Sequence, residues 1–278
     1  MTEPHDAWSA VAAAWADLWG GVAAPVWPPL LAAAGVAPGA RVLDVGCGSG
    51  ELLARLAGGG ARATGVDPAP AMVRLARERA PEATVLVGEA EHLPLDDGAF
   101  DVVLAVNALQ LADDLGEAAA ELARVLAPGG RVGLAGWAEG ARNDLDVVER
   151  AVAAAYEDDP PHDGPLRRPG GFEATLAGAG LEVVGAGVVD VAWETAADDT
   201  LAHGVLLGED PATLAELAPV VVAAAAPFRT PDGGYRLAGA FRWAVGPRCL
   251  SRSGRGRRRR RQRRRRTTTA PDHRGGRA

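Results

Sequence analysis

The chain has 278 residues, a formal net charge of −7 and 48% hydrophobic residues, enough for one large domain with a sizeable core. Its basic residues are all arginine and are unevenly spread. Residues 248–278 hold 14 arginines against one acid, a net charge of +13, whereas residues 1–247 have a net charge of −20. So acidic a body argues against general electrostatic binding of nucleic acid.

Neither cysteine points to a disulfide framework or a metal site. Cys47 and Cys249 lie far apart in the sequence, and neither sits at a metal-ligand spacing. The first residues are acidic and polar, unlike a secretory signal, and the longest apolar stretch, residues 220–228, is too short to span a bilayer. We therefore expect a cytoplasmic monomer or homodimer with no metal and no membrane span.

Residues 7–34 predict two helices. Trp8, Trp15 and Trp19 are spaced by seven and four residues, which places them on one helical face. These indoles either pack the helix onto the core or, for Trp15 and Trp19, close over a ligand. We assign residues 1–39 to an N-terminal helical cap.

Apolar runs then alternate with helical periodicity as far as residue 135. Near-continuous apolar strands are typical of a parallel sheet covered on both faces, joined by right-handed crossovers. With two further strands at 181–193 and 234–245, the sequence predicts an α/β fold: a doubly wound, Rossmann-like, seven-stranded, mostly parallel sheet with helices on both faces. The first five strands are expected at 42–45, 63–67, 84–87, 100–106 and 131–135, with helices at 51–56, 68–80 and 115–126.

A glycine-rich turn follows the first strand. Gly46, Gly48 and Gly50 separate that strand from a helix, and such a turn presents backbone N–H groups to an anionic or carboxylate-bearing ligand. The dinucleotide fingerprint G-x-G-x-x-G would need glycine at position 51, where this chain has Glu51. Asp67 ends the next strand.

Four motifs in order carry a family resemblance. Residues 42–50, Val-Leu-Asp-Val-Gly-Cys-Gly-Ser-Gly, resemble the first motif of class I S-adenosylmethionine-dependent methyltransferases, and residues 65–72 resemble the second. Residues 89–103 and 121–131 are similar to the later motifs of the ubiquinone/menaquinone-type (methyltransferase type 11) small-molecule branch. Together they cover about residues 40–136.

The resemblance implies S-adenosyl-L-methionine as cofactor and methyl transfer to a small organic acceptor by in-line displacement. Residues 40–247 would form the methyltransferase domain, with acceptor-covering helices within about 143–226. Residues 248–278 would be an Arg-rich disordered tail. Two alternatives stay open: an RNA or protein methyltransferase that uses the tail, and a non-catalytic S-adenosylmethionine-binding protein.

The resemblance also implies a set of cofactor-binding residues. Asp67 would accept hydrogen bonds from both ribose hydroxyls, with a helix N-cap as the alternative role. Asp44 would support the methionine amino group or serve as a buried acid bonded to loop N–H groups. Glu89 and Ala90 would lie at the adenine, and Met72 would pack on the ribose or adenine or in the helix core. The full predicted set is Asp44, Gly46, Cys47, Gly48, Gly50, Asp67, Pro68, Met72, Glu89, Ala90, Glu91 and Asn107.

No catalytic residue is assigned from the sequence. A base is needed only if the acceptor is protonated at the working pH, and His92 and His203 are candidates by residue type alone. Cys47 has no histidine near it in sequence to activate it as a nucleophile. Trp137, directly after the fifth strand, is a candidate for the wall of the acceptor pocket.

Overall fold

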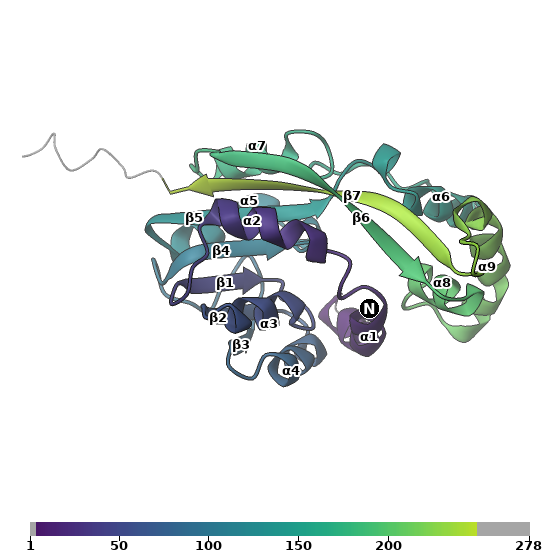
Figure 1. Cartoon of the computed structure of the whole chain (residues 1–278), viewed down its shortest axis with the longest axis horizontal. Coiled ribbons are helices and arrows are strands. Elements are labelled where there is room, and N and C mark those ends of the chain that lie inside the picture. Colours follow the sequence, from purple (N-terminus) through teal and green to yellow (C-terminus); the bar gives the residue numbers. More distant parts are fainter. Residues whose placement is uncertain (1–3, 249–278) are drawn as a thin grey trace, which may run out of the picture.

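The structure is a computed structural model and describes residues 4–248, with side chains described from residue 7. One seven-stranded sheet runs through it in the order β3-β2-β1-β4-β5-β7-β6, which confirms the predicted fold class (Figure 1). The first five strands pair in parallel, and β7 is antiparallel to both of its neighbours. The strands are β1 (Arg41–Val45), β2 (Arg62–Asp67), β3 (Thr84–Val87), β4 (Phe100–Val106), β5 (Leu126–Trp137), β6 (Gly185–Thr195) and β7 (Tyr235–Pro247).

Helices cover both faces of this sheet because its strands are apolar on both sides. Adjacent residues of β1, Val42 and Leu43, are both fully buried and belong to different hydrophobic clusters, as the alternation of side chains along a strand requires. Leu30 of α2 lies in the first cluster and Leu122 of α5 in the second. The helices are α1 (Pro4–Leu18), α2 (Trp27–Ala34), α3 (Glu51–Gly58), α4 (Pro70–Arg79), α5 (Leu115–Val125), α6 (Leu145–Ala155), α7 (Gly171–Gly178), α8 (Asp198–Val205) and α9 (Pro211–Ala224).

The strand order fixes where a ligand can enter. From β1 the chain moves outward to β2 and β3, then returns to β4 on the other side of β1. The connections that leave the carboxyl ends of β1 and β4 therefore run in opposite directions and leave a crevice there.

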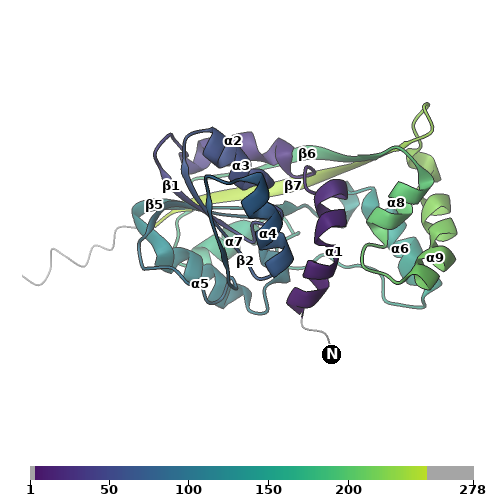
Figure 2. The same ribbon diagram turned by 90° about the horizontal axis from the view of Figure 1, so that it is seen from below.

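The last two strands extend beyond the rest of the sheet. Trp137 of β5 pairs with Phe241 of β7, and residues 235–240 of β7 pair only with β6. Helices α6, α8 and α9 gather around this two-stranded extension, away from the parallel strands (Figure 1). Helix α1 stands between α4 and α8 (Figure 2). It thus joins the parallel part of the sheet to the C-terminal helices.

Several predicted boundaries differ from the structure. Strand β5 begins at Leu126, so Pro128-Gly129-Gly130 lies within it rather than after a helix. Gly130 fits there because a Cβ on it would lie 2.7 Å from the Asp101 carbonyl oxygen. Strand β6 begins at Gly185, not at residue 181. Helix α2 packs on β5 and β7 and so belongs to a sheet-covering layer.

The Arg-rich tail lies outside the described residues, except for Arg248. That residue is bound to the body: its backbone N–H donates to Gly130 O at 3.0 Å, and its Nη1 donates to Leu126 O at 2.7 Å. Among residues 4–248, no helix is both long enough and apolar enough to cross a membrane.

Candidate functional site

A cavity of about 370 Å³ lies at the carboxyl ends of β1, β2 and β4, beneath α1. Its volume falls within the range of small-molecule pockets. Eleven of the twelve predicted cofactor residues line it; the exception is Gly50. Sequence positions from 44 to 107 are therefore brought together around one space.

The glycine turn has its shape for reasons of conformation and space. Gly46 has φ of 70°, and a Cβ on it would lie 2.3 Å from the Cβ of Ala108. Gly50 has φ of 90°, and its Cβ would lie 2.7 Å from the Cα of Ala76 in α4. A side chain at either position would require both a strained backbone and a displaced neighbour. Gly50 thus packs α3 against α4 and does not face the cavity.

Most N–H groups of this turn already have partners. Gly46 N–H and Cys47 N–H donate to the carbonyl oxygen of Val66 at 2.8 and 3.1 Å, and Gly48 N–H donates to Asp67 Oδ2 at 2.8 Å. The turn is consequently held against the end of β2. These hydrogen bonds position the turn beside the cavity, a role that the sequence pattern did not indicate.

Asp67 is 7% exposed, and its two oxygens accept from different loops. Oδ2 accepts from Gly48 N–H, and Oδ1 accepts from Ala69 N–H at 3.0 Å. The residue that caps α4 is Ala69, so Asp67 is not the N-cap itself. A carboxylate can accept several hydrogen bonds at once, so the group that holds these two loops is also of the type that accepts from hydroxyl donors.

Asp44 is 2% exposed and has no hydrogen bond or ion pair with any described residue. Burial, followed by the nearby charges of Asp67 and Glu51, raises the pKa of Asp44 to about 8. The bonds to loop N–H groups that a purely structural acid would make are not found. A cation placed in the cavity would stabilise the ionised form of this buried carboxyl group.

Glu51 and Trp27 also line the cavity, although sequence reasoning gave them no role. Glu51 accepts a hydrogen bond from Ser49 Oγ at 2.7 Å and pairs with Arg79. The Trp27 indole nitrogen is the one polar side-chain atom of the described residues that is fully shielded from solvent and has no hydrogen-bond partner. No sequence pattern predicts an unpaired indole N–H, because it depends on how α2 packs against the ends of the strands.

The loop after β3 forms the far wall of the cavity. Two side chains of α5 hold this loop: Glu121 accepts from Leu93 N–H at 3.0 Å, and Arg124 donates to Leu93 O and Leu95 O. Glu89 is exposed at the rim, and Glu91 accepts weakly from Asp114 N–H at 3.3 Å.

Asn107 directly follows β4 and has φ of 53°, and its side chain accepts from Gln110 Nε2 at 3.1 Å. The left-handed conformation is one that asparagine tolerates better than most residues. It turns the chain sharply away from the sheet, directly beside the cavity.

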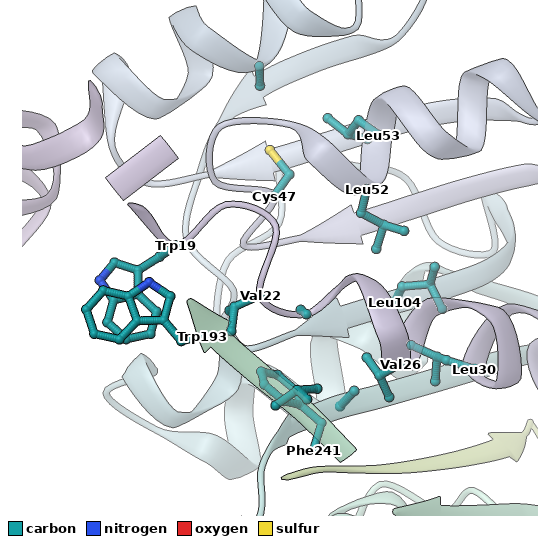
Figure 3. Close-up of a cluster of buried hydrophobic side chains, with 14 of the residues drawn as sticks. Trp19, Val22, Val26, Leu30, Cys47, Leu52, Leu53, Leu104, Trp193 and Phe241 are labelled. Atoms are coloured by element: carbon teal, nitrogen blue, oxygen red, sulfur yellow. The ribbon is translucent and has the colours of Figure 1, made fainter. Parts of the chain in front are cut away.

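The titratable candidates named from residue type lie elsewhere. His92 and His203 are exposed and line neither this cavity nor the second one described below. Cys47 is buried against Gly65 in the hydrophobic cluster that contains Leu53 (Figure 3). Burial and the charge of Asp44 raise the pKa of the Cys47 thiol, which disfavours the nucleophilic thiolate. No group of acids, histidines and cysteines in the described part could hold a metal ion.

The tryptophans form one wall. Trp8, Trp15 and Trp19 line the cavity, and Met72 packs with Trp8 and Trp15 in a small cluster beneath α1. Trp137 contacts Trp19 edge to face, with ring centroids 6.5 Å apart. The predicted face of indoles is therefore present, and it serves packing and cavity lining at once.

Two acidic side chains and the glycine turn suit an elongated ligand that carries a positively charged group. Asp44 offers an unpaired carboxyl group, Asp67 offers acceptor capacity for hydroxyls, and the glycine turn leaves room for close approach. The ammonium and the ribose diol of S-adenosylmethionine match Asp44 and Asp67, and its carboxylate end suits the glycine turn, so the residues present fit that group.

Comparison with known proteins points the same way. Residues 43–134 match the family described as methyltransferase domain. A malonyl-[acyl-carrier protein] O-methyltransferase of Geobacter sulfurreducens is 45% identical over 128 residues, which is 44% of this chain and 48% of that protein. The chain spans between 38% and 48% of the length of the curated relatives it matches.

Solved structures show the same fold at low identity. A SAM-dependent methyltransferase from Thermotoga maritima has a TM-score of 0.50 at 20% identity, over 88% of this chain and 99% of that one. A [4+2]-cyclase, SpnF, has a TM-score of 0.59 at 18% identity, over 87% and 94% of the two chains. The fold is therefore shared by proteins that are named for different reactions.

Proposed function

We propose that this chain, whose residues 43–134 belong to the type 11 family of class I methyltransferases, transfers a methyl group from S-adenosylmethionine to a small organic acceptor. The observation that carries the proposal is the presence of two different acids in one cavity: Asp44, which has no hydrogen bond to a described residue, and Asp67, which accepts hydrogen bonds from Gly48 N–H and Ala69 N–H. Neither alone would select this ligand. Together they offer a cation site and a diol site at neighbouring strand ends.

The burial and hydrogen bonds of each side chain suggest which part of the cofactor it would hold. Asp44 would take the methionine ammonium, because the added positive charge compensates a buried carboxyl group that has no counter-ion. Asp67 would accept hydrogen bonds from the ribose hydroxyls, because its carboxylate lines the cavity at the end of β2. Glu89 and Ala90 would receive the adenine, and Met72 would pack against it.

S-adenosylmethionine supplies a methyl group already activated by its sulfonium. The protein then has to hold an acceptor in line and exclude water, and such positioning can supply much of the rate enhancement. The indoles of Trp15 and Trp19 suit this task, because they close one side of the cavity with apolar surface. Their faces also attract a cationic sulfonium.

Two alternatives make different predictions. A non-catalytic binding protein would bind the cofactor without turnover, and the likeness to a cyclase shows that this fold alone does not fix the reaction. An RNA or protein methyltransferase would need the tail, which lies outside the described residues. The acidic body disfavours polyanionic acceptors.

The direct test is transfer of a tritium-labelled methyl group from S-adenosylmethionine to a panel of amines, phenols and carboxylic acids, with total RNA as a further acceptor. The proposal expects labelled product with at least one small molecule and none with RNA. Asp67→Asn should lower transfer about tenfold or more at subsaturating S-adenosylmethionine, whereas the exposed Asp96→Asn, which makes the same chemical change outside the cavity, should leave it unchanged. Cofactor binding without any labelled product would favour the non-catalytic alternative.

A further inference from the structure

A second cavity lies behind the wall of tryptophans. It has a volume of about 360 Å³ and is bounded by α1, the end of β5, α6 and the segment from Gly204 to Gly208. Four indoles line it, and the other lining residues are aliphatic or glycine with a single exception. That exception is Glu149 of α6. The indoles are those of Trp8, Trp15, Trp19 and Trp137.

Glu149 is a half-buried carboxylate that makes no hydrogen bond or ion pair with any described residue. Arg167, one of the two arginines whose charge acts on Glu149, is engaged elsewhere: it donates to Asp146 at 2.6 Å and pairs with Asp163 at 3.3 Å. Burial raises the pKa of Glu149 to about 7, and the charge of Asp146 adds to this, while Arg167 and Arg150 act in the opposite direction. The lining residues of α1, β5 and α8 carry no charge. The cavity is thus apolar and aromatic, with one acidic group that makes no ion pair with a described residue.

We propose that this second cavity receives the methyl acceptor and that the acceptor is an amine with an apolar body, its ammonium held by Glu149 and its body by the indoles. The inference rests on the proposed methyl transfer, because it identifies the acceptor of that reaction. A carboxylate in an apolar pocket is satisfied best by a cation. Indole faces attract the same charge, and the strongly acidic body raises the local concentration of cations.

Other acceptor classes fit this cavity less well. A carboxylate or phosphate acceptor would meet the charge of Glu149 at close range, and a neutral phenol would leave that charge uncompensated. The malonyl-carrier acceptor in the name of the Geobacter relative is anionic, so an amine acceptor here would differ in charge from the one in that name.

The two cavities share a wall. Trp8, Trp15 and Trp19 line both, so an acceptor in the second cavity is separated from the methyl-donor cavity by indole rings. The acceptor nitrogen must pass between these rings to reach the donor. Glu149 can also take the ammonium proton: the N–H bond breaks, the proton moves to a carboxylate oxygen, and the electron pair stays on nitrogen, ready to attack.

A pair of matched probes tests the inference by calorimetry at pH 8. There Glu149 is ionised and 2-phenylethylamine is protonated, whereas 2-phenylethanol has a similar shape without the charge. We expect the amine to bind wild-type protein at least about tenfold more tightly than the alcohol, as a charged hydrogen-bonded pair allows. Equal binding of the two probes, or no binding of either, would overturn the inference without any variant.

Glu149→Gln removes the charge at nearly constant volume and should weaken amine binding about tenfold or more, with binding of the alcohol unchanged. Glu82→Gln makes the same change at an exposed position outside both cavities and should leave both probes unaffected. Unchanged amine affinity in Glu149→Gln would contradict the role of Glu149. S-adenosylhomocysteine is titrated into the wild-type protein as well: absence of its binding there counts against the proposed function, whereas binding of S-adenosylhomocysteine without preferential binding of the amine counts against this inference alone.

Discussion

Trp19 and Trp193 stack with ring centroids 4.1 Å apart, although 174 positions separate them in the chain (Figure 3). Each indole N–H also donates across the junction: Trp19 Nε1 to Gly204 O at 3.1 Å, and Trp193 Nε1 to Leu18 O at 2.8 Å. This reciprocal pair fixes the end of α1 to β6 and α8. The wall of indoles between the two cavities therefore depends on a contact between the segment that follows α1 and strand β6.

Gly204→Ala should weaken this junction. A Cβ at position 204 would lie 2.4 Å from the Trp193 ring, so either the ring or α8 must shift. We expect the free energy of unfolding to fall by about 1–3 kcal/mol, as overpacking usually costs, measured by urea denaturation. Gly178→Ala, in a helix with open space around it, should change it by no more than about 1 kcal/mol. Equal effects of the two changes would contradict the packing argument.

Asp44→Asn should remove a pH dependence of stability. Because the folded-state pKa of Asp44 is about 8 and its ordinary value is 3.8, the folded state holds a proton that the unfolded state releases between these values. Stability should therefore fall as pH rises from 4 to 8, by up to about 1.4 kcal/mol per pH unit from this group. Denaturation series should show wild type losing stability relative to Asp44→Asn across this range. A constant difference would show that Asp44 titrates normally.

Ligand binding should couple to the same group. An ammonium beside Asp44 favours the ionised carboxylate, so S-adenosylmethionine binding at pH 7 should release close to one proton, about as many as Asp44 holds there. The measurement is the dependence of calorimetric enthalpy on the ionisation enthalpy of the buffer. Asp44→Asn should bind more weakly and lose this dependence. Binding that releases no proton in wild type would contradict a cation site at Asp44.

Gly46→Ala tests the glycine turn. The change forces an L-residue to φ of 70° and places its Cβ 2.3 Å from the Cβ of Ala108, beside the cavity. Gly39→Ala makes the same change at φ of 80° with nothing nearby, so it isolates the backbone strain. Both variants should lose about 1 kcal/mol of stability from strain, and Gly46→Ala should lose more and bind the cofactor more weakly. Identical losses in both variants would mean that crowding at position 46 is unimportant.

Arg124→Gln should loosen the loop after β3. Arg124 donates to the carbonyl oxygens of Leu93 and Leu95 and pairs with Glu121 and Asp97. Its loss should lower the free energy of unfolding by about 1–3 kcal/mol. Cofactor affinity should fall severalfold, because this loop forms the adenine side of the cavity. Arg74→Gln removes only an exposed pair with Glu78 and should cost less than about 0.5 kcal/mol. Thermal unfolding and cofactor titration distinguish these results.

The parallel half of the fold could be predicted because its signals are local. Apolar strands, the glycine turn and Asp67 follow one another at short spacing, and β1 to β4 lie close to where they were expected. The second cavity could not be predicted. Glu149 looks like an ordinary polar position of a surface helix, and its lack of a partner arises only when α1, α6 and α8 meet. The place of Trp27 at the first cavity could not be predicted for the same reason.

The central claim is that Asp44 and Asp67 together hold S-adenosylmethionine. The most direct measurement is calorimetric titration of S-adenosylhomocysteine into wild type, Asp67→Asn and the exposed control Asp96→Asn. We predict one site per chain in wild type and in the control, with affinity about tenfold or more lower in Asp67→Asn, since two hydroxyl bonds to a carboxylate are weakened. No saturable binding in wild type, or equal affinity in wild type and Asp67→Asn, would contradict the account.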